Sequence, residues 1–420
     1  MKLYVKPSSP LSGNIKAPPS KSATHRAFIF SLTGSGVFKI RNPLMSDDTR
    51  STLEAIRLMG AHVSGEGTQT IESELHQAEN VIDAGNSGTT ARLISSVCAL
   101  LPGLGVVTGD ASLLRRPMGP LLEAITQLGG RAEATFAAGR LPCIFGGPLK
   151  GERAAMRGDI SSQFASSLAI ACCRRETDTQ IELEGRIQSI DYLLLTLQLI
   201  AYFGGKAVFE DSVLYCSGSG PFKARSITIP GDFSSAAFIL SAAAVTGGGV
   251  RVAGLDNRFI QADSRITRIL ADFGCSIERG KGSVTATGGK LAGAEIDCSS
   301  SPDLFPITCV VAAAASGKSV IRGTENLRFK ESDRIAATER MLKALGVKCE
   351  QHGHGLEIHG GVIRGGRVDS EGDHRIAMAA CVAGLASERG CVVEKGECYT
   401  VSYPGFVDDI RSCGGRVSLV

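Results

Sequence analysis

The sequence of 420 residues contains no tryptophan, and aromatic residues make up only 5% of it. Its 45 lysines and arginines nearly balance its 42 acidic residues, which leaves a net charge of +3. We therefore expect neither an aromatic platform for base stacking nor a strongly basic surface. This composition argues against nucleic acid as a partner.

Long hydrophobic runs are also missing. The most apolar stretches, residues 234–248 and 305–317, are shorter than the roughly 18 residues that a membrane-spanning helix needs. Residues 1–13 lack the apolar core of a signal peptide, and Pro7 and Pro10 interrupt them. We expect a cytoplasmic protein with no membrane partner.

The thirteen cysteines include no Cys-x-x-Cys pair, and the seven histidines show no ligand spacing. An odd number of cysteines scattered through apolar patterns is typical of reduced, buried thiols. A zinc site is therefore not expected, and we predict no bound metal.

One pattern recurs six times along the chain: an amphipathic helical segment, a bulky residue, a glycine and a β-prone segment. The glycines of this pattern are Gly60, Gly129, Gly204, Gly274, Gly346 and Gly414. Successive members are 69, 75, 70, 72 and 68 residues apart, which predicts six similar α/β units. Each glycine suits the left-handed position that follows a helix.

Each unit also begins with a second helix, rich in alanine and serine, behind a residue that can cap it. The predicted capping residues are Ser22, Ser87, Ser161, Ser234, Ser300 or Ser301, and Asp373. Six units are too many for one core, so we expect two domains of three units, residues 20–229 and residues 1–19 with 230–420. A cleft between them, bordered by helix starts, would suit anions.

The predicted helix starts of the first domain carry cationic and hydroxyl side chains. Candidate anion-binding residues there are Lys21, Ser22, Arg26, Gly88, Arg116, Ser161, Ser162 and Gln163. Ser22 and Arg26 are four apart and share a helix face. Each segment alone is also typical of a capped or solvated helix start.

The second domain contains the run from Asn326 to Arg334, with three cations and two carboxylates around one phenylalanine. On an extended segment Arg328 and Lys330 point the same way, and on a helix Glu331 and Arg334 share a face. Asp303 and Arg375 stand at two other predicted helix starts. Alone, the run also fits a solvated helix start, where acids meet the helix dipole.

Taken together, these segments resemble the 5-enolpyruvylshikimate-3-phosphate synthase family nearly end to end. The matching strings, in the order and near the spacing of the family, are PPSKSATHR, GNSGTTAR, RRPMGPL, SSQF, PGDFSSAA, SSPDLFP, NLRFKESDR and DHRIAMA. The resemblance implies a two-domain enolpyruvyl transferase fold of six βαβαββ units with the active site in the interdomain cleft. It also implies transfer of the enolpyruvyl group of phosphoenolpyruvate to shikimate 3-phosphate, by a monomer without a cofactor.

The resemblance also assigns roles to individual residues. Shikimate 3-phosphate would contact Lys21, Ser22, Arg26, Ser161, Ser162, Gln163, Asp303, Asn326 and Lys330. Phosphoenolpyruvate would contact Lys21, Gly88, Arg116, Gln163, Arg334 and Arg375. Asp303 would act as base toward the 5-hydroxyl, Glu331 as acid and then base at the methylene carbon, and Lys21 would assist the departing phosphate.

The match departs from the family near the C-terminus, where Val401 stands in place of an expected lysine. Weaker phosphoenolpyruvate binding is the implied consequence. The sensitivity to glyphosate, which depends on this lysine in the family, stays open. The roles of Arg186, Ser189 and Tyr192 stay open, because that stretch lacks the usual register. The alternatives are a UDP-N-acetylglucosamine enolpyruvyl transferase and a non-catalytic binder of anionic metabolites.

Overall fold

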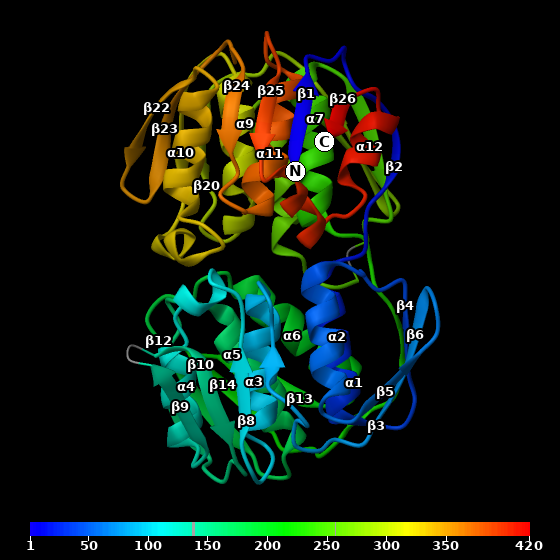
Figure 1. Ribbon diagram of the computed structural model, residues 1–420, viewed down its shortest axis with the longest axis vertical. Helices are drawn as coiled ribbons and strands as arrows, with labels where there is room; N and C mark the ends of the chain where they lie inside the picture. Colours follow the sequence, from blue (N-terminus) through cyan, green and yellow to red (C-terminus); the bar gives the residue numbers. More distant parts are fainter. Residues whose placement is uncertain (137–138, 257) are drawn as a thin grey trace. The chain divides into compact units, whose positions relative to one another are not determined.

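A computed structural model describes residues 1–136, 139–256 and 258–420 of the chain (Figure 1). The chain forms two compact units, Pro19–Ile229 and Met1–Pro18 with Pro230–Val420. Among the described residues, no helix combines the length and apolar character needed to cross a membrane.

Each unit contains three four-stranded sheets, counted over the described residues, and every sheet joins one parallel pair to two antiparallel strands. In Pro19–Ile229 the sheets are, in spatial order, β16 (Ser226–Thr228), β4 (Phe38–Arg41), β6 (Thr68–Ser73) and β5 (Ala61–Ser64); β7 (Ile82–Asp83), β8 (Gly105–Thr108), β10 (Arg140–Gly146) and β9 (Arg131–Phe136); and β11 (Arg153–Arg157), β12 (Thr179–Glu184), β14 (Val213–Ser217) and β13 (Lys206–Glu210). A short parallel pair joins β3 (Gly34–Ser35) to β15 (Phe222–Lys223).

The other unit repeats this plan and uses the N-terminal strands to do so. Its sheets are β18 (Ser276–Gly280), β19 (Ser283–Thr287), β17 (Gly249–Ala253) and β2 (Ser12–Lys16); β20 (Glu295–Asp297), β21 (Gly317–Arg322), β23 (Gly355–Gly360) and β22 (Lys348–His352); and β24 (Gly366–Asp369), β25 (Cys391–Glu394), β1 (Lys2–Lys6) and β26 (Arg416–Leu419). Backbone pairing of β1 and β2 therefore attaches residues 1–18 to this unit.

Two α-helices accompany each sheet in the described part of the chain. They are α1 (Lys21–Thr33), α2 (Asp47–Arg57), α3 (Gly88–Cys98), α4 (Gly119–Gln127), α5 (Ser162–Arg174), α6 (Ile190–Tyr202), α7 (Phe233–Thr246), α8 (Ile266–Asp272), α9 (Phe305–Ala314), α10 (Arg334–Ala344), α11 (His374–Leu385) and α12 (Phe406–Ser412). Short 3-10 turns are η1 (Leu113–Arg115), η2 (Ala262–Arg265), η3 (Pro302–Leu304), η4 (Glu325–Phe329) and η5 (Gly396–Val401). The predicted fold class, six α/β units arranged three and three, is confirmed.

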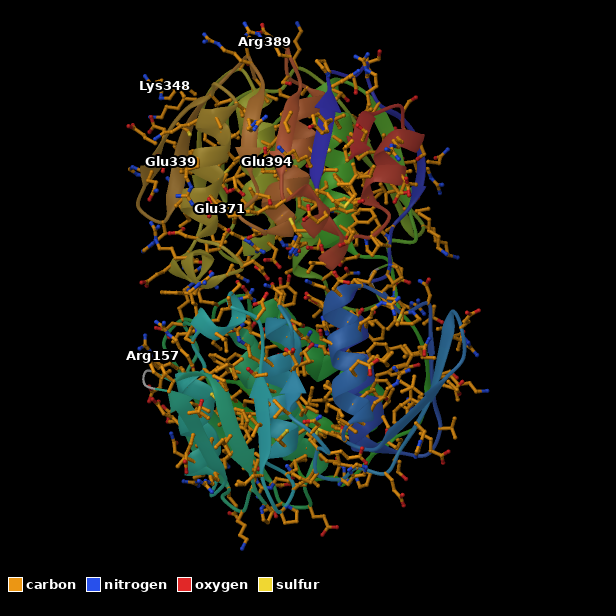
Figure 2. All side chains as sticks on the ribbon, viewed as in Figure 1. Arg157, Glu339, Lys348, Glu371, Arg389 and Glu394 are labelled. Atoms are coloured by element: carbon orange, nitrogen blue, oxygen red, sulfur yellow. The ribbon has the colours of Figure 1, made fainter. Side chains whose placement is uncertain are left out.

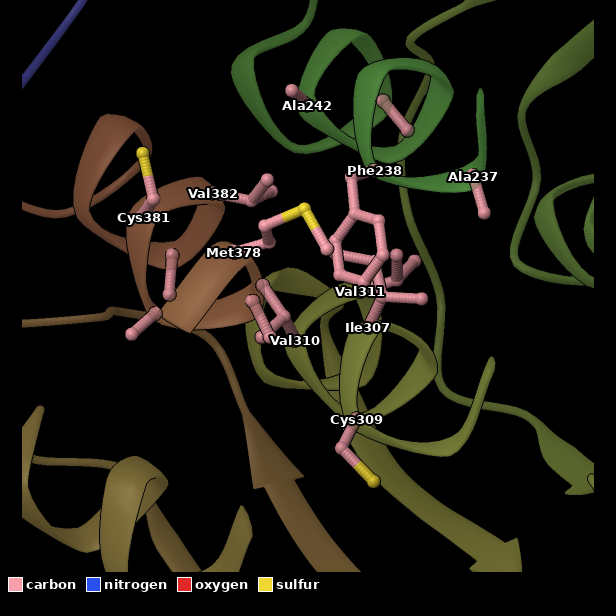
Figure 3. Packing of buried hydrophobic residues seen from close by; sticks show 14 of the residues in the cluster. Ala237, Phe238, Ala242, Ile307, Cys309, Val310, Val311, Met378, Cys381 and Val382 are labelled. Atoms are coloured by element: carbon pink, nitrogen blue, oxygen red, sulfur yellow. The ribbon is translucent and has the colours of Figure 1, made fainter. Parts of the chain in front are cut away.

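The first helix of each repeat is buried on all sides, which explains its Ala- and Ser-rich sequence. In Pro230–Val420, helices α7, α9 and α11 pack against one another. Figure 3 shows the sulfur of Met378 and the side chain of Val311 beside the ring of Phe238, with Val310 and Val382 completing the contact. This close packing fixes the starts of the three helices, where the charged residues lie.

The structure corrects some of the predicted helix caps. Ser87, Ser161 and Asp373 cap their helices as predicted, but the capping residues of α1 and α7 are Ser20 and Asp232. The predictions of Ser22 and Ser234 were wrong because an equally suitable residue stands two positions earlier. All six repeat glycines have φ between +80° and +100°, so the predicted left-handed positions are confirmed.

Candidate active site

Arg334 lies at the centre of an ion-pair cluster in Pro230–Val420. It is the first residue of α10, its side chain is 1% exposed, and its three guanidinium nitrogens all face carboxylates. Nε donates to Asp373 (2.9 Å), Nη1 to Asp303 (2.6 Å) and Nη2 to Glu331 (2.5 Å). Burial alone would lower the pKa of Arg334, but the three carboxylates raise that pKa above its usual value.

Asp303, in η3, is the meeting point of three cations. Its Oδ1 lies 2.6 Å from Nη1 of Arg334 and 3.5 Å from Nζ of Lys330, and its Oδ2 accepts from Nη2 of Arg375 at 3.1 Å. The structure therefore brings together Asp303, Lys330, Glu331, Arg334 and Arg375, which come from three segments of the sequence. Such a cluster can bind anions and transfer protons.

The run before α10 departs from its predicted conformation. Residues Glu325–Phe329 form a 3-10 turn, so Arg328 and Lys330 do not share one side of an extended segment. Arg328 pairs with Asp333 at 2.9 Å, whereas Lys330 faces Asp303. Asn326 is buried in the turn and accepts from the hydroxyl of Thr324. Glu331 pairs with Arg334, but it lies before the first residue of α10, so the predicted shared helix face is not formed.

In Pro19–Ile229, the start of α1 carries two cations with different partners. Lys21 pairs with Asp48 in the first turn of α2, with 2.6 Å between Nζ and Oδ2. Arg26 is 1% exposed and donates to neutral acceptors: Thr196 Oγ1 (2.7 Å) and the backbone carbonyls of Ser22 and Tyr192 (both 3.0 Å). Because of burial, the pKa of Arg26 falls to about 10.

The starts of α3 and α5 meet in a second polar cluster of the same unit. Ser161 caps α5, and Arg92 donates from Nη1 to Ser161 Oγ (3.2 Å) and to Gln163 Oε1 (2.9 Å). Gln163 in turn donates to Thr89 Oγ1 at 2.9 Å. Ser162 begins α5 and is buried beside them. Hydroxyl, amide and guanidinium donors at a helix start form a good phosphate site.

Arg116 lies against Gly88 at the start of α3. A Cβ atom added at Gly88 would lie 3.0 Å from Nη1 of Arg116, so a larger residue there would require the guanidinium to shift. Arg116 is also held by Asn86 Oδ1 (3.0 Å) and Ser112 Oγ (3.3 Å). The glycine thus leaves room for a cation at the start of α3.

Sequence reasoning missed four residues of these clusters. Asp48 and Arg92 hold predicted site residues, Thr89 is the partner of Gln163, and Asp373 was predicted only as a cap although it also anchors Arg334. Acidic residues in the first turn of α2 were visible in the sequence, but no spacing connected them to Lys21.

The structure also places the residues whose roles the sequence left open. Ser189 has a left-handed backbone (φ +54°) before α6, and Tyr192 supports Arg26 through its carbonyl. Val401 ends η5 and is partly buried. The nearest preceding lysine, Lys395, pairs with Asp369 at 3.0 Å on the surface, so it does not supply the missing cation.

The geometry defines a class of protein: two three-sheet units with buried cations at their helix starts, suited to multiply charged anions. A sequence model described as EPSP synthase (3-phosphoshikimate 1-carboxyvinyltransferase) matches residues 5–410. The 3-phosphoshikimate 1-carboxyvinyltransferases of Methanocella arvoryzae and Methanocorpusculum labreanum are 41% and 39% identical, over 97% and 99% of both chains. The chain therefore belongs to the EPSP synthase family.

Solved structures agree with this assignment. An EPSP synthase structure from Acinetobacter baumannii has a TM-score of 0.82 and 28% identity, and the match covers 100% of both chains. Among the described residues, no group of three or more histidine, cysteine or acidic side chains is arranged to hold a metal ion.

Proposed function

We propose that this chain is an active 3-phosphoshikimate 1-carboxyvinyltransferase. It joins the enolpyruvyl group of phosphoenolpyruvate to the 5-hydroxyl of shikimate 3-phosphate, releases inorganic phosphate and serves aromatic biosynthesis. The observation that carries this proposal is the cluster around Arg334, in which two carboxylates suited to proton transfer, Asp303 and Glu331, share one guanidinium.

The charge of the substrates matches the cations of the two units. Each substrate has a phosphate and a carboxylate, so together they carry roughly −5 to −6 at neutral pH. We assign shikimate 3-phosphate to Lys21, Ser22, Arg26, Ser161, Ser162, Gln163, Asp303, Asn326 and Lys330. We assign phosphoenolpyruvate to Lys21, Gly88, Arg116, Gln163, Arg334 and Arg375.

The proposed reaction has an addition step and an elimination step. In the first, Asp303 accepts the proton of the 5-hydroxyl as its oxygen bonds to the central carbon of phosphoenolpyruvate, and protonated Glu331 donates to the methylene carbon. In the second, the bond to phosphate breaks, Glu331 takes a proton back from the methyl group, and Lys21 stabilises the departing phosphate. Asp303 then loses its proton to phosphate or solvent.

The contacts of Arg334 add a requirement to this scheme. Its nitrogens already donate to Asp303, Glu331 and Asp373. A substrate carboxylate that binds Arg334 must therefore displace at least one of them. Because Asp373 is the most buried of the three, we infer that Glu331 or Asp303 is displaced, which frees it to contact the substrate.

We further propose that the enzyme is a cytoplasmic monomer. All thirteen cysteines are described and none forms a disulfide, which fits a reducing compartment. Both clusters lie on one chain, so one copy supplies every assigned residue. Specific activity that does not change on dilution, with a single-chain mass in solution, is the expected result.

The deciding experiment follows phosphate release from shikimate 3-phosphate and phosphoenolpyruvate. We expect turnover, and a loss of about 10²–10⁴-fold in kcat for Asp303→Asn, because the base is removed while the shape is kept. Glu357→Gln removes the charge of a partly exposed carboxylate that is bound to Lys318 in the same unit; it is the control and should leave kcat unchanged.

Two outcomes would contradict the proposal. Substrate binding without phosphate release would indicate a non-catalytic binder. Turnover with UDP-N-acetylglucosamine in place of shikimate 3-phosphate would move the chain to the other branch of enolpyruvyl transferases.

A further inference from the structure

Asp263 is a buried acid that the proposed mechanism does not use. It lies in η2, its side chain is 3% exposed, and neither carboxylate oxygen has a hydrogen-bond partner among the described residues. A buried carboxylate without hydrogen bonds is costly. Its retention at this place therefore requires an explanation.

The backbone ties Asp263 to the segment that carries Asp303. The hydroxyl of Ser301 donates to the carbonyl of Ala262 at 3.1 Å. Gln261 accepts from the backbone N–H of Phe233 at 3.0 Å and donates to the carbonyl of Gly231 at 2.9 Å, which attaches η2 to the start of α7. Asp263 is thus fixed among the starts of α7 and η3.

The groups that act on Asp263 come from several elements. Burial is the main cause that raises its pKa to about 7, and the charges of Asp303 and Asp232 raise it further, while Arg375 and the Ser234 hydroxyl oppose the rise. The remaining charged groups nearby are accounted for. Cys298 is a neutral thiol whose pKa burial raises to about 12, the side chain of Arg265 bonds to Ser300, and Arg268 and Asp272 of α8 pair with each other at 2.8 Å.

We propose that Asp263 is a positioning residue for this reaction: its buried negative charge makes Asp303 a better proton acceptor. Lys330, Arg334 and Arg375 surround Asp303 and oppose its protonation. An ionised Asp263 offsets those cations, because protonation of Asp303 relieves the repulsion between two carboxylates. This inference rests on the proposed function.

The proposal predicts that activity depends on the ionisation of Asp263. In the wild-type chain, kcat should rise with pH through about 7, the pKa of Asp263. Asp263→Asn keeps the shape but cannot ionise, so this rise should disappear. The value of kcat at pH 8 should fall on the order of 10-fold, while the KM for shikimate 3-phosphate changes by less than about 2-fold.

Ser234→Ala gives an independent test. The Ser234 hydroxyl favours the charged form of Asp263, so its removal should move the rise in kcat to higher pH. A merely structural role for Ser234 would lower activity at every pH without moving the midpoint. A pH profile of Asp263→Asn that superimposes on that of the wild type, or a shift to lower pH in Ser234→Ala, would overturn the proposal.

Thermal unfolding separates this proposal from the proposed function. Asp263 keeps its proton in the folded state up to pH about 7 but loses it near pH 4 when unfolded. Its burial therefore lowers stability progressively as pH rises between these values. The Tm of Asp263→Asn relative to wild type should be higher at pH 8 than at pH 5, whether or not the chain turns over substrate. An equal Tm difference at both pH values would contradict the assigned ionisation, and an absence of turnover in the wild type would contradict only the function.

Discussion

Two buried arginines, one in each unit, show how the same side chain can be prepared for different tasks. Arg26 and Arg334 are both 1% exposed and both use three guanidinium nitrogens. Arg26 meets a hydroxyl and two carbonyls, and burial lowers its pKa to about 10. Arg334 meets three carboxylates, which raise its pKa.

The difference lies in net charge. Around Arg26, neutral acceptors hold the guanidinium in place without cancelling its charge, so an incoming anion gains the full attraction. The guanidinium of Arg334 already pairs with three carboxylates, so Arg334 acts first as the support of Asp303, Glu331 and Asp373. An anion gains less at Arg334, unless it displaces a carboxylate.

Replacing each arginine by methionine should expose this difference most strongly. Arg334→Met leaves three carboxylates near one another with a buried partner missing, which should lower the free energy of unfolding by about 3–5 kcal/mol. Arg26→Met leaves only neutral acceptors unsatisfied, a cost of about 1–3 kcal/mol. Denaturant unfolding of both variants at pH 7.5 measures the two costs.

Arg340→Met is the matched control on α10. Arg340 is 57% exposed and pairs with Glu371 at 2.6 Å, and Figure 2 labels Glu371 among the charged side chains of this unit. Exposed pairs contribute little, so its loss should cost less than about 1 kcal/mol. Equal costs for Arg26→Met and Arg334→Met would remove the distinction between the two arginines.

The sequence predicted the repeated elements of the fold and the contacts between residues close in sequence. The repeat glycines located six helix ends. The three-residue spacing of Glu331 and Arg334 indicated that the two side chains lie close together, although they pair just before the helix and not on one of its faces. The sequence strings shared with the family assigned Asp303 and Arg375 to the same site. No periodicity in the sequence connects these two residues.

Contacts between distant segments could not be predicted in this way. Lys21 and Asp48 are 27 residues apart, and Arg92 and Gln163 are 71 apart. These contacts depend on how whole helices pack, and no local pattern records that packing. Arg328 illustrates the opposite error, because a local extended segment was assumed where the chain forms a 3-10 turn.

Val401→Lys should sharpen the comparison by adding a cation at the end of η5. If this position faces phosphoenolpyruvate, as the family pattern implies, the added charge should contribute about 1.5–3 kcal/mol and lower the KM for phosphoenolpyruvate roughly 10- to 100-fold. Steady-state kinetics at constant salt measure the change. Val362→Lys, at a 62% exposed position of the same unit, makes the same charge change and should leave that KM unaltered. An unchanged KM in Val401→Lys would show that the missing lysine is not the cause of any weak binding.

The smallest effect is expected in the pH dependence of folding stability, which we attribute to the histidine next to Arg26. His25 is buried and bonds through Nδ1 to Thr52 Oγ1 at 2.6 Å. Burial, with Lys21 and Arg26, holds its pKa well below the usual value. As pH falls below about 6.5, the unfolded chain binds a proton that the folded chain excludes, so stability falls by up to about 2 kcal/mol between pH 6.5 and 5. His25→Asn should lose less stability over this interval, measured as the difference in Tm from the wild type at the two pH values. This sign is opposite to that for Asp263. The same dependence on pH in His25→Asn and the wild type would contradict the lowered pKa of His25.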